Sequence, residues 1–367
     1  MKVEVTQENL SRALQNVSRV ASSRTNLPIL NNILIRTIGK QLFIAATNLE
    51  IAATQKIGAK ISTQGSITIP AKLITEFVGN LPKSTVQLEV KNNSITITCE
   101  AYTSVINGIK DDEFPELPEI DEKSAIHLTL KPDTFKKSVS QTIIAASGDT
   151  TRPVLTGVYC HTVDGMLFFA ATDGYRLAEK QVIATKDNLT AIIPVSTLQE
   201  VIRTITDDIE EIEILFDDTQ VRFRLNDSEI TSRLIDGKFP DYRQLIPTSN
   251  TTTSTITTSD FVRITKIAGL FARESGGVVT INADEAKNAL VIHSVASELG
   301  ENTSEIAAKN SGKTGSVNLN SRYLLEVLTV IDESSVQLAF SGPLAPCILT
   351  PMAKNTDYLH IIMPIKS

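Results

Sequence analysis

The amino-acid sequence predicts an α+β fold made of three copies of one unit, in which helices cover one face of antiparallel sheets. Three observations lead to this prediction. A helical segment opens each unit, a strand followed by a helix recurs later in each unit, and alternating segments lie between them. Because three units of similar length account for all 367 residues, the repeat describes the whole chain.

Each unit is expected to open with an amphipathic helix, because apolar residues recur at helical spacing and mark one buried face. The three segments are residues 6–21, 131–146 and 258–272. Thr6 and Ser259 suit the N-cap positions of the first and third helices, and Pro132 suits the first turn of the second.

The second helix of each unit is expected directly after a short strand. The three segments read ITIPAKLITEFV from Ile67, AIIPVSTLQEVI from Ala191 and VNLNSRYLLEVL from Val317. One shared position is held by Pro70, Pro194 and Asn320, at successive offsets of 124 and 126 residues. The helix of each segment is predicted to follow this position.

The segments between the helices alternate apolar and polar residues, which predicts strands. In the first two units, LPIL at 27–30 matches RPVL at 152–155, and IAATN at 44–48 matches FAATD at 169–173, both at an offset of 125 residues. The agreement ends at the next turn, where Leu49-Glu50-Ile51 stands opposite Gly174-Tyr175-Arg176. The sequences of the two units therefore agree along the strand and part company at the turn.

Two Pro-rich segments, residues 111–124 and 237–254, are predicted to be linkers between the units. They divide the chain into three expected domains of one fold. The predicted boundaries are 1–121, 122–247 and 248–367.

Charge is distributed unevenly between the predicted helices and the rest of the chain. The formal net charge is −7, which taken alone argues against a general polyanion binder. The stretches that contain the six predicted helices hold 13 basic and 6 acidic residues, a balance of +7; they are residues 6–24, 70–83, 131–147, 194–206, 258–273 and 320–330. The remaining 22 basic and 36 acidic residues leave −14. Solvated helix faces would explain this contrast, and so would a basic helical surface that meets phosphates without reading bases.

No motif in the sequence requires an enzyme. Gly312-Lys313-Thr314 lacks the earlier glycine of a phosphate loop, because Ala307 stands there. The His and Cys residues are scattered, so no metal ligand set, cofactor or catalytic residue is expected. The isolated cysteines and the polar N-terminus favour a cytoplasmic protein. Acidic runs leave a metal-dependent phosphatase as the competing interpretation, and an interaction scaffold of the same fold is a third.

Three segments, together with the triple repeat, carry a resemblance to a known family. They are ATDGYRLA at 171–178, DGKFPDYRQLIP at 236–247 and MPIKS at 363–367. The chain resembles the bacterial DNA polymerase III beta subunits, the replicative sliding clamps. The resemblance implies three DNA-clamp domains, a ring-forming homodimer around duplex DNA, and a processivity factor that is not an enzyme. The implied partners are double-stranded DNA, the replicative polymerase, the clamp loader and other peptides with a clamp-binding motif.

The resemblance also implies two sets of site residues. The first is a peptide-binding pocket between the second and third domains, formed by Leu155, Thr172, Gly174, Tyr175, Arg176, Leu177, Pro240, Leu245, Asn320, Tyr323, Leu344, Pro346, Ile361, Met363, Pro364 and Ile365. The second set faces DNA and comprises Arg24, Lys72, Lys136, Lys137, Arg152 and Arg203. This chain departs from the family at Asp149, Pro153, Val154 and Gln244, where relatives often carry other residues.

Overall fold

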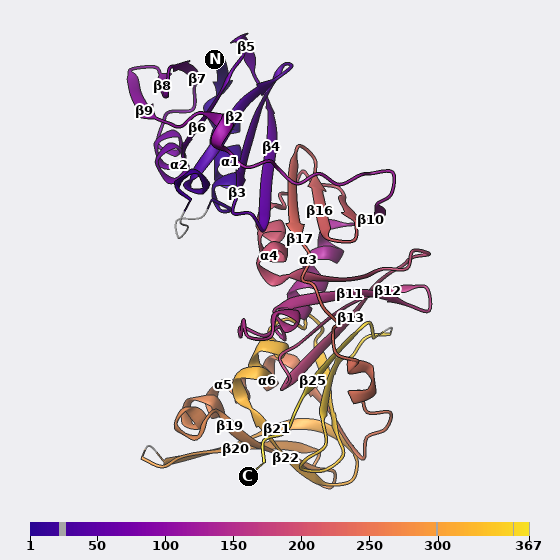
Figure 1. Cartoon of the computed structure of the whole chain (residues 1–367). Helices are drawn as coiled ribbons and strands as arrows, with labels where there is room; N and C mark the ends of the chain where they lie inside the picture. Colours follow the sequence, from indigo (N-terminus) through magenta and orange to yellow (C-terminus); the bar gives the residue numbers. More distant parts are fainter. Residues whose placement is uncertain (22–26, 299, 355, 367) are drawn as a thin grey trace. The chain divides into compact units, whose positions relative to one another are not determined.

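The same order of elements occurs three times along the chain (Figure 1). A computed structural model describes residues 1–21, 27–298, 300–354 and 356–366. In each repeat a strand and a helix are followed by four or five strands, a second helix and three more strands. Among the described residues the α-helices are α1 Gln7–Ser18, α2 Ala71–Gly79, α3 Pro132–Ile143, α4 Val195–Thr204, α5 Thr258–Ala272 and α6 Ser321–Leu328.

The strands fall into three sets that follow the repeats. Those of the first repeat are β1 Lys2–Thr6, β2 Asn32–Ile38, β3 Gln41–Thr47, β4 Ile51–Gly58, β5 Lys60–Thr63, β6 Ser66–Pro70, β7 Thr85–Lys91, β8 Ser94–Cys99 and β9 Tyr102–Asn107. Those of the second are β10 Ile126–Leu130, β11 Gly157–Val163, β12 Met166–Thr172, β13 Arg176–Ala184, β14 Thr190–Pro194, β15 Ile212–Phe216, β16 Gln220–Leu225 and β17 Ser228–Arg233. Those of the third are β18 Thr252–Thr257, β19 Val278–Asp284, β20 Ala289–Ala296, β21 Gly300–Gly312, β22 Gly315–Asn320, β23 Ser335–Phe340, β24 Cys347–Pro351 and β25 Tyr358–Ile362.

Strand register confirms the repeat at the level of single residues. Leu34 lies opposite Ala45 in the pairing of β2 with β3, and Tyr159 lies opposite Ala170 in the pairing of β11 with β12. Both members of the second pair are 125 residues beyond the first, which is the offset read from the sequence. The shared position before the second helix is likewise kept, because Pro70, Pro194 and Asn320 each end the strand that precedes α2, α4 and α6.

The chain forms two compact units, and the division between them falls inside the second repeat. The first unit comprises Met1–Pro132 and Ser196–Leu234, and the second comprises Asp133–Val195 and Ile235–Ser367. Within the described residues, the first unit holds a sheet of order β5-β1-β7-β8-β9 and another of order β10-β15-β16-β17-β4-β3-β2-β6. The second unit holds a single sheet of order β14-β11-β12-β13-β25-β24-β23-β18-β21-β20-β19-β22. The boundaries 1–121, 122–247 and 248–367 remain predictions.

Helices cover the sheets through the apolar faces that the sequence predicts. In α1 the buried side chains include Leu10, Leu14 and Val17, and α1 contacts α2, β3 and β4. In the second unit α5 contacts α6, β20 and β21 (Figure 1). Burying such a face is the main source of helix stability in a protein of this kind, because short helices are marginal in water.

The helix caps differ in part from those predicted. Thr6 precedes α1, but its side chain makes no capping hydrogen bond, and Ser259 lies within α5 rather than at its start. The prediction for Pro132 is confirmed, because α3 begins there. At α6, the side chain of Asn320 accepts hydrogen bonds from the backbone N–H groups of Arg322 and Tyr323, which satisfies two donors that the helix cannot pair itself.

The cysteines lie within the core. Cys99, Cys160 and Cys347 are buried and free, and burial raises the pKa of Cys347 to about 12. Such thiols act as small apolar side chains rather than as nucleophiles. Among the described residues, no group of three or more His, Cys, Asp or Glu side chains is arranged to hold a metal ion. None of the helices that they form is long and apolar enough to span a membrane.

Candidate peptide pocket and DNA-facing residues

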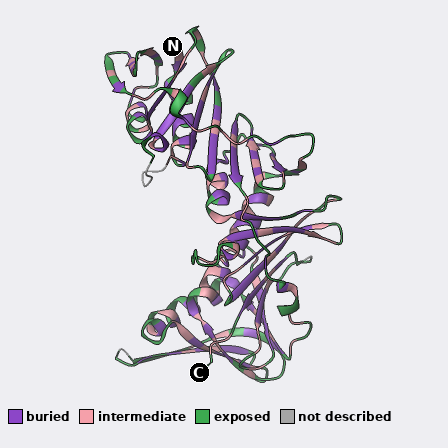
Figure 2. Cartoon of the chain, in the orientation of Figure 1, coloured by how far each residue is buried: buried purple, intermediate pink, exposed green. Residues whose placement is uncertain are grey.

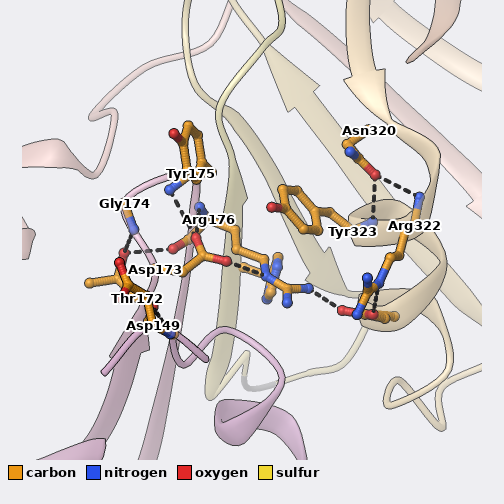
Figure 3. Close-up of polar contacts among 12 residues, drawn as sticks. Asp149, Thr172, Asp173, Gly174, Tyr175, Arg176, Asn320, Arg322 and Tyr323 are labelled. Carbon is orange, nitrogen blue, oxygen red and sulfur yellow. Dashed lines mark hydrogen bonds and ion pairs between the residues drawn. The ribbon is translucent and has the colours of Figure 1, made fainter. Parts of the chain in front are cut away.

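The turn between β12 and β13 is fixed by its own side chains (Figure 3). The hydroxyl of Thr172 donates to the carbonyl of Arg176 at 2.6 Å and accepts from the N–H of Gly174 at 3.1 Å. The Asp173 carboxylate accepts from the N–H groups of Tyr175 and Arg176 at 2.9 and 3.0 Å. Gly174 has φ +90°, a conformation that glycine adopts without strain. The turn therefore presents Tyr175 to solvent, with 67% of its surface exposed.

The corresponding turn of the first repeat has the same hydrogen bonds. The Thr47 hydroxyl donates to the carbonyl of Ile51 and accepts from the N–H of Leu49, and the Asn48 side chain accepts from the next two N–H groups. Leu49 also has a positive φ, of 76°. Thr and Asx side chains therefore fix the backbone of both turns in the same way, although the two sequences differ. Only the side chains that the turns present are different.

Arg176 is buried and links this turn to α6. Its Nε donates to Asp173 at 3.0 Å, its Nη1 pairs with Glu326, and its guanidinium lies 4.2 Å from the centre of the Tyr323 ring (Figure 3). Burial raises the pKa of Glu326, but Arg176 and Arg322 outweigh this effect and hold the pKa below its ordinary value. The charge of Arg176 is thus compensated within the chain, and its contacts fix the turn.

The C-terminal segment lies beside the same turn. Strand β25 pairs with β13, so that Ile361 lies opposite Leu177. Beyond the strand, the N–H of Met363 donates to the carbonyl of Tyr175 at 2.8 Å, and the N–H of Ile365 donates to Asn318 at 2.8 Å. These bonds bring Tyr175 and Met363 together from positions almost two hundred residues apart.

The predicted pocket residues divide into buried members, here called the floor, and exposed members, here called the rim. Figure 2 colours the described residues of the chain by this burial. Leu155, Leu177 and Ile361 are buried and belong to one apolar cluster with Phe239, Tyr242 and Ile348. The exposed apolar members are Tyr175, Leu245, Leu344 and Met363, which are 67%, 60%, 63% and 37% exposed. The remaining members are half-buried, apart from the exposed Gly174 and Pro240 and the buried Arg176.

One groove was not found by the sequence analysis. It lies between α5 and α6, has a volume of about 750 Å³, and contains Asn320 of the predicted pocket residues. Its apolar lining includes Ile267 and Leu270, which are 40% and 54% exposed. These two residues interrupt the polar face of an otherwise amphipathic α5, and this interruption is the signal in the sequence that indicates the groove.

The predicted DNA-facing residues have different surroundings. Arg24 lies outside the described residues. Lys72, Arg152 and Arg203 are exposed, although Arg203 pairs with Glu200, which also binds Arg19 at 3.0 Å. A cation already paired in this way attracts a phosphate less strongly than a free one.

Lys136 and Lys137 are neighbours on α3, but only one of them is ion-paired. The Nζ of Lys137 lies 3.1 Å from Glu333 and 3.5 Å from Asp332. Burial lowers the pKa of Lys137, but these two carboxylates outweigh it and raise the pKa above its ordinary value. Lys136 has no ion pair within the part of the chain that the structure describes. Its charge is therefore available to a ligand, whereas that of Lys137 is largely compensated.

Comparison with known proteins agrees with this architecture along the whole chain. Residues 1–118, 129–241 and 243–366 match the N-terminal, central and C-terminal domains of the DNA polymerase III beta subunit. The beta sliding clamp of Bacillus subtilis strain 168 is 31% identical over 382 aligned residues, which cover 100% of both chains. The crystal structure of the sliding clamp from Bacillus subtilis has a TM-score of 0.94 at 29% identity and covers 100% of this chain and 99% of that one. A clamp from Bartonella birtlesii bound to griselimycin has a TM-score of 0.94 at 26% identity and covers 100% of both chains.

Three α+β repeats of one topology, joined edge to edge by strand pairing, define the class of DNA clamp proteins. The chain belongs to the DNA polymerase III beta subunit family. It is a DNA sliding clamp, a processivity factor of replication rather than an enzyme, and this family forms homodimeric rings. Membership of the family excludes the metal-dependent phosphatase that the acidic runs left open.

Proposed function

We propose that the floor and rim described above form the site at which this clamp holds short, partly apolar peptides of its polymerase and clamp loader. One observation carries the proposal: the predicted residues combine four exposed apolar side chains with members of one buried apolar cluster, although exposed apolar side chains usually avoid water. Apolar anchors in a preformed pocket supply most of the binding energy of a linear peptide. Griselimycin, bound by the relative from Bartonella birtlesii, is proposed to bind here as well.

Met363→Ala tests this proposal most directly. Met363 is partly exposed and only its backbone is used in the contact with Tyr175, so its side chain can be removed without breaking a hydrogen bond. We expect griselimycin, titrated by calorimetry, to bind about 10-fold more weakly, because an apolar anchor is lost. Dimerisation should not change.

Met352→Ala is the matched control. Met352 is 49% exposed and directly follows β24. It lies at the end of β24 opposite Cys347, and Cys347 pairs with Ile362, the residue before Met363. Its removal should leave the affinity for griselimycin unchanged. Equal affinity of Met363→Ala and the wild-type chain would remove Met363 from the site.

We further propose that Lys72, Lys136, Arg152 and Arg203, together with Arg24, contribute a smooth attraction for the phosphates of the enclosed duplex. Lys137 and Arg203 contribute less, since Glu333 and Asp332 compensate the charge of Lys137 and Glu200 pairs with Arg203. Retention by a closed ring needs no base contacts, and sequence-specific contacts would stall sliding.

We also propose a cytoplasmic location. The chain acts in replication of the chromosome, and its buried, free cysteines suit a reducing compartment.

A further inference from the structure

Residues 236–247 carry two members of the proposed pocket, Pro240 and Leu245, on a segment that is held by its buried side chains. Phe239 and Tyr242 are buried, at 5% and 2% exposure, whereas Pro240 and Leu245 are exposed. Residues Tyr242–Leu245 form a single turn of 3₁₀-helix. The position of Leu245 therefore depends on how Tyr242 is held.

A chain of polar contacts holds Tyr242 against the sheet. Its hydroxyl donates to the Glu179 carboxylate on β13 and lies 2.8 Å from Nε2 of His161 on β11. Burial, together with the charge of Arg243, lowers the pKa of His161 to about 4, so this histidine is neutral at pH 7. Because the Tyr242 hydrogen is used towards Glu179, the neutral His161 must donate from Nε2 to the Tyr242 oxygen.

The neighbouring side chains complete the attachment. Arg243 pairs with the same Glu179 carboxylate at 3.1 Å, and its guanidinium lies 4.3 Å from the centre of the Phe168 ring on β12. Tyr159 stacks on Phe239 with ring centres 4.8 Å apart. Strands β11, β12 and β13 thus each contribute a side chain that binds the segment.

The first repeat shows that the fold itself does not need this polar chain. At the 125-residue offset, strand register relates His161 and Glu179 to Arg36 and Thr54. The same offset relates Tyr242 to Leu117, as it relates Phe239-Pro240 to Phe114-Pro115 in the sequence. There Leu117 packs on an apolar cluster, and Arg36 donates to Asp111 at 2.9 Å instead.

The residue that corresponds to Leu245 shows what the polar chain changes. In the first repeat this residue is Ile120, which is 6% exposed, whereas Leu245 is 60% exposed. The apolar residue at this position is therefore buried in the repeat that lacks the polar contacts and exposed in the repeat that has them.

We propose that Tyr242 and Glu179 are positioning residues of the peptide pocket, which act by holding Leu245 on its rim. This inference rests on the proposed function of the rim. Neither residue is expected to touch the peptide, because both lie beneath the segment. Removal of the Tyr242 hydroxyl should release the turn and weaken peptide binding through Leu245 alone.

The test is a double-mutant cycle of Tyr242→Phe and Leu245→Ala, with griselimycin titrated by calorimetry. Each single variant should bind about 10-fold more weakly, and the double variant should bind no more weakly than Leu245→Ala, because both changes remove one contact. A general structural defect would instead make the two losses multiply. Glu179→Gln, which keeps an acceptor for the hydroxyl, should retain affinity that Glu179→Ala loses.

Tyr358→Phe is the matched control. Tyr358 is 2% exposed and its hydroxyl donates to the carbonyl of Gln141 at 3.0 Å, so this variant should lose similar stability in thermal unfolding without losing affinity. Wild-type affinity of Tyr242→Phe, or multiplying losses in the cycle, would overturn the inference while Leu245→Ala still supports the pocket. Wild-type affinity of Leu245→Ala would instead remove Leu245 from the pocket, and the inference with it.

Discussion

Arg176 is stabilised by two carboxylates from different parts of the fold, Asp173 in its own turn and Glu326 on α6. Since the guanidinium is almost fully buried, loss of either partner would leave charge poorly compensated in a place that water hardly reaches. The backbone bonds of the turn and the cation–π contact with Tyr323 add to the same attachment. The exposed Tyr175 is thereby held on a rigid base.

Glu326→Gln should lower the free energy of unfolding at pH 7 by about 1–2 kcal/mol, because a charge-assisted hydrogen bond to Arg176 becomes a neutral one. The folded pKa of Glu326 lies below 4.5, so its carboxylate stabilises the fold above that pH and loses its effect as the pH falls further. The difference between variant and wild type, measured by urea unfolding, should therefore shrink below about pH 4.5.

The control is Glu76→Gln at the corresponding position of α2, where the side chain is exposed. This change should be nearly neutral at every pH. A constant loss of stability across the pH range in Glu326→Gln would show that its effect is not electrostatic.

At the level of elements, α3 shows why some site residues could be predicted from sequence and others could not. Helical spacing located α3 and its buried Phe135 and Val139, because periodicity reports burial directly. It could not distinguish Lys136 from Lys137, since the partners of Lys137 lie about two hundred residues further along the chain. Pairing of β13 with β25 and the polar chain at Tyr242 were invisible for the same reason.

Lys136→Ala and Lys137→Ala form a matched pair on this helix. Lys136→Ala should weaken binding to a short duplex at low salt and reduce the slope of log affinity against log salt by about 1, as expected when one phosphate contact is lost. Lys137→Ala should change the slope much less, because Glu333 and Asp332 already compensate that charge. Fluorescence anisotropy over a salt series measures both. Equal slopes for the two variants would contradict this distinction.

At the scale of the whole molecule, strand pairing between repeats follows one rule. The last strand of the second repeat, β17, pairs with β4, which is the third strand after α1 in the first repeat. In the same way β25 pairs with β13. Within the described residues, the equivalent strands β9 and β21 are left over: β9 is an edge strand, and Gly300–Ala307 of β21 pairs only with β20. A second copy of the chain would supply each with the partner that the rule requires.

Val105→Glu should therefore convert the dimer, of twice the 39.9 kDa chain mass, into monomers, because it places a charge on the exposed edge strand β9. Val105 is 63% exposed, so the change should cost the folded monomer little stability. Light scattering at micromolar concentration gives the mass, and retention on circular DNA should be lost with the dimer. Ile38→Glu, at the end of β2 and 47% exposed, should leave the dimer intact. If β9 joins the two subunits, the dimer of Val105→Glu would have to bury a charge without a partner, which is costly. A Val105→Glu chain that remains dimeric would therefore place the subunit contact elsewhere.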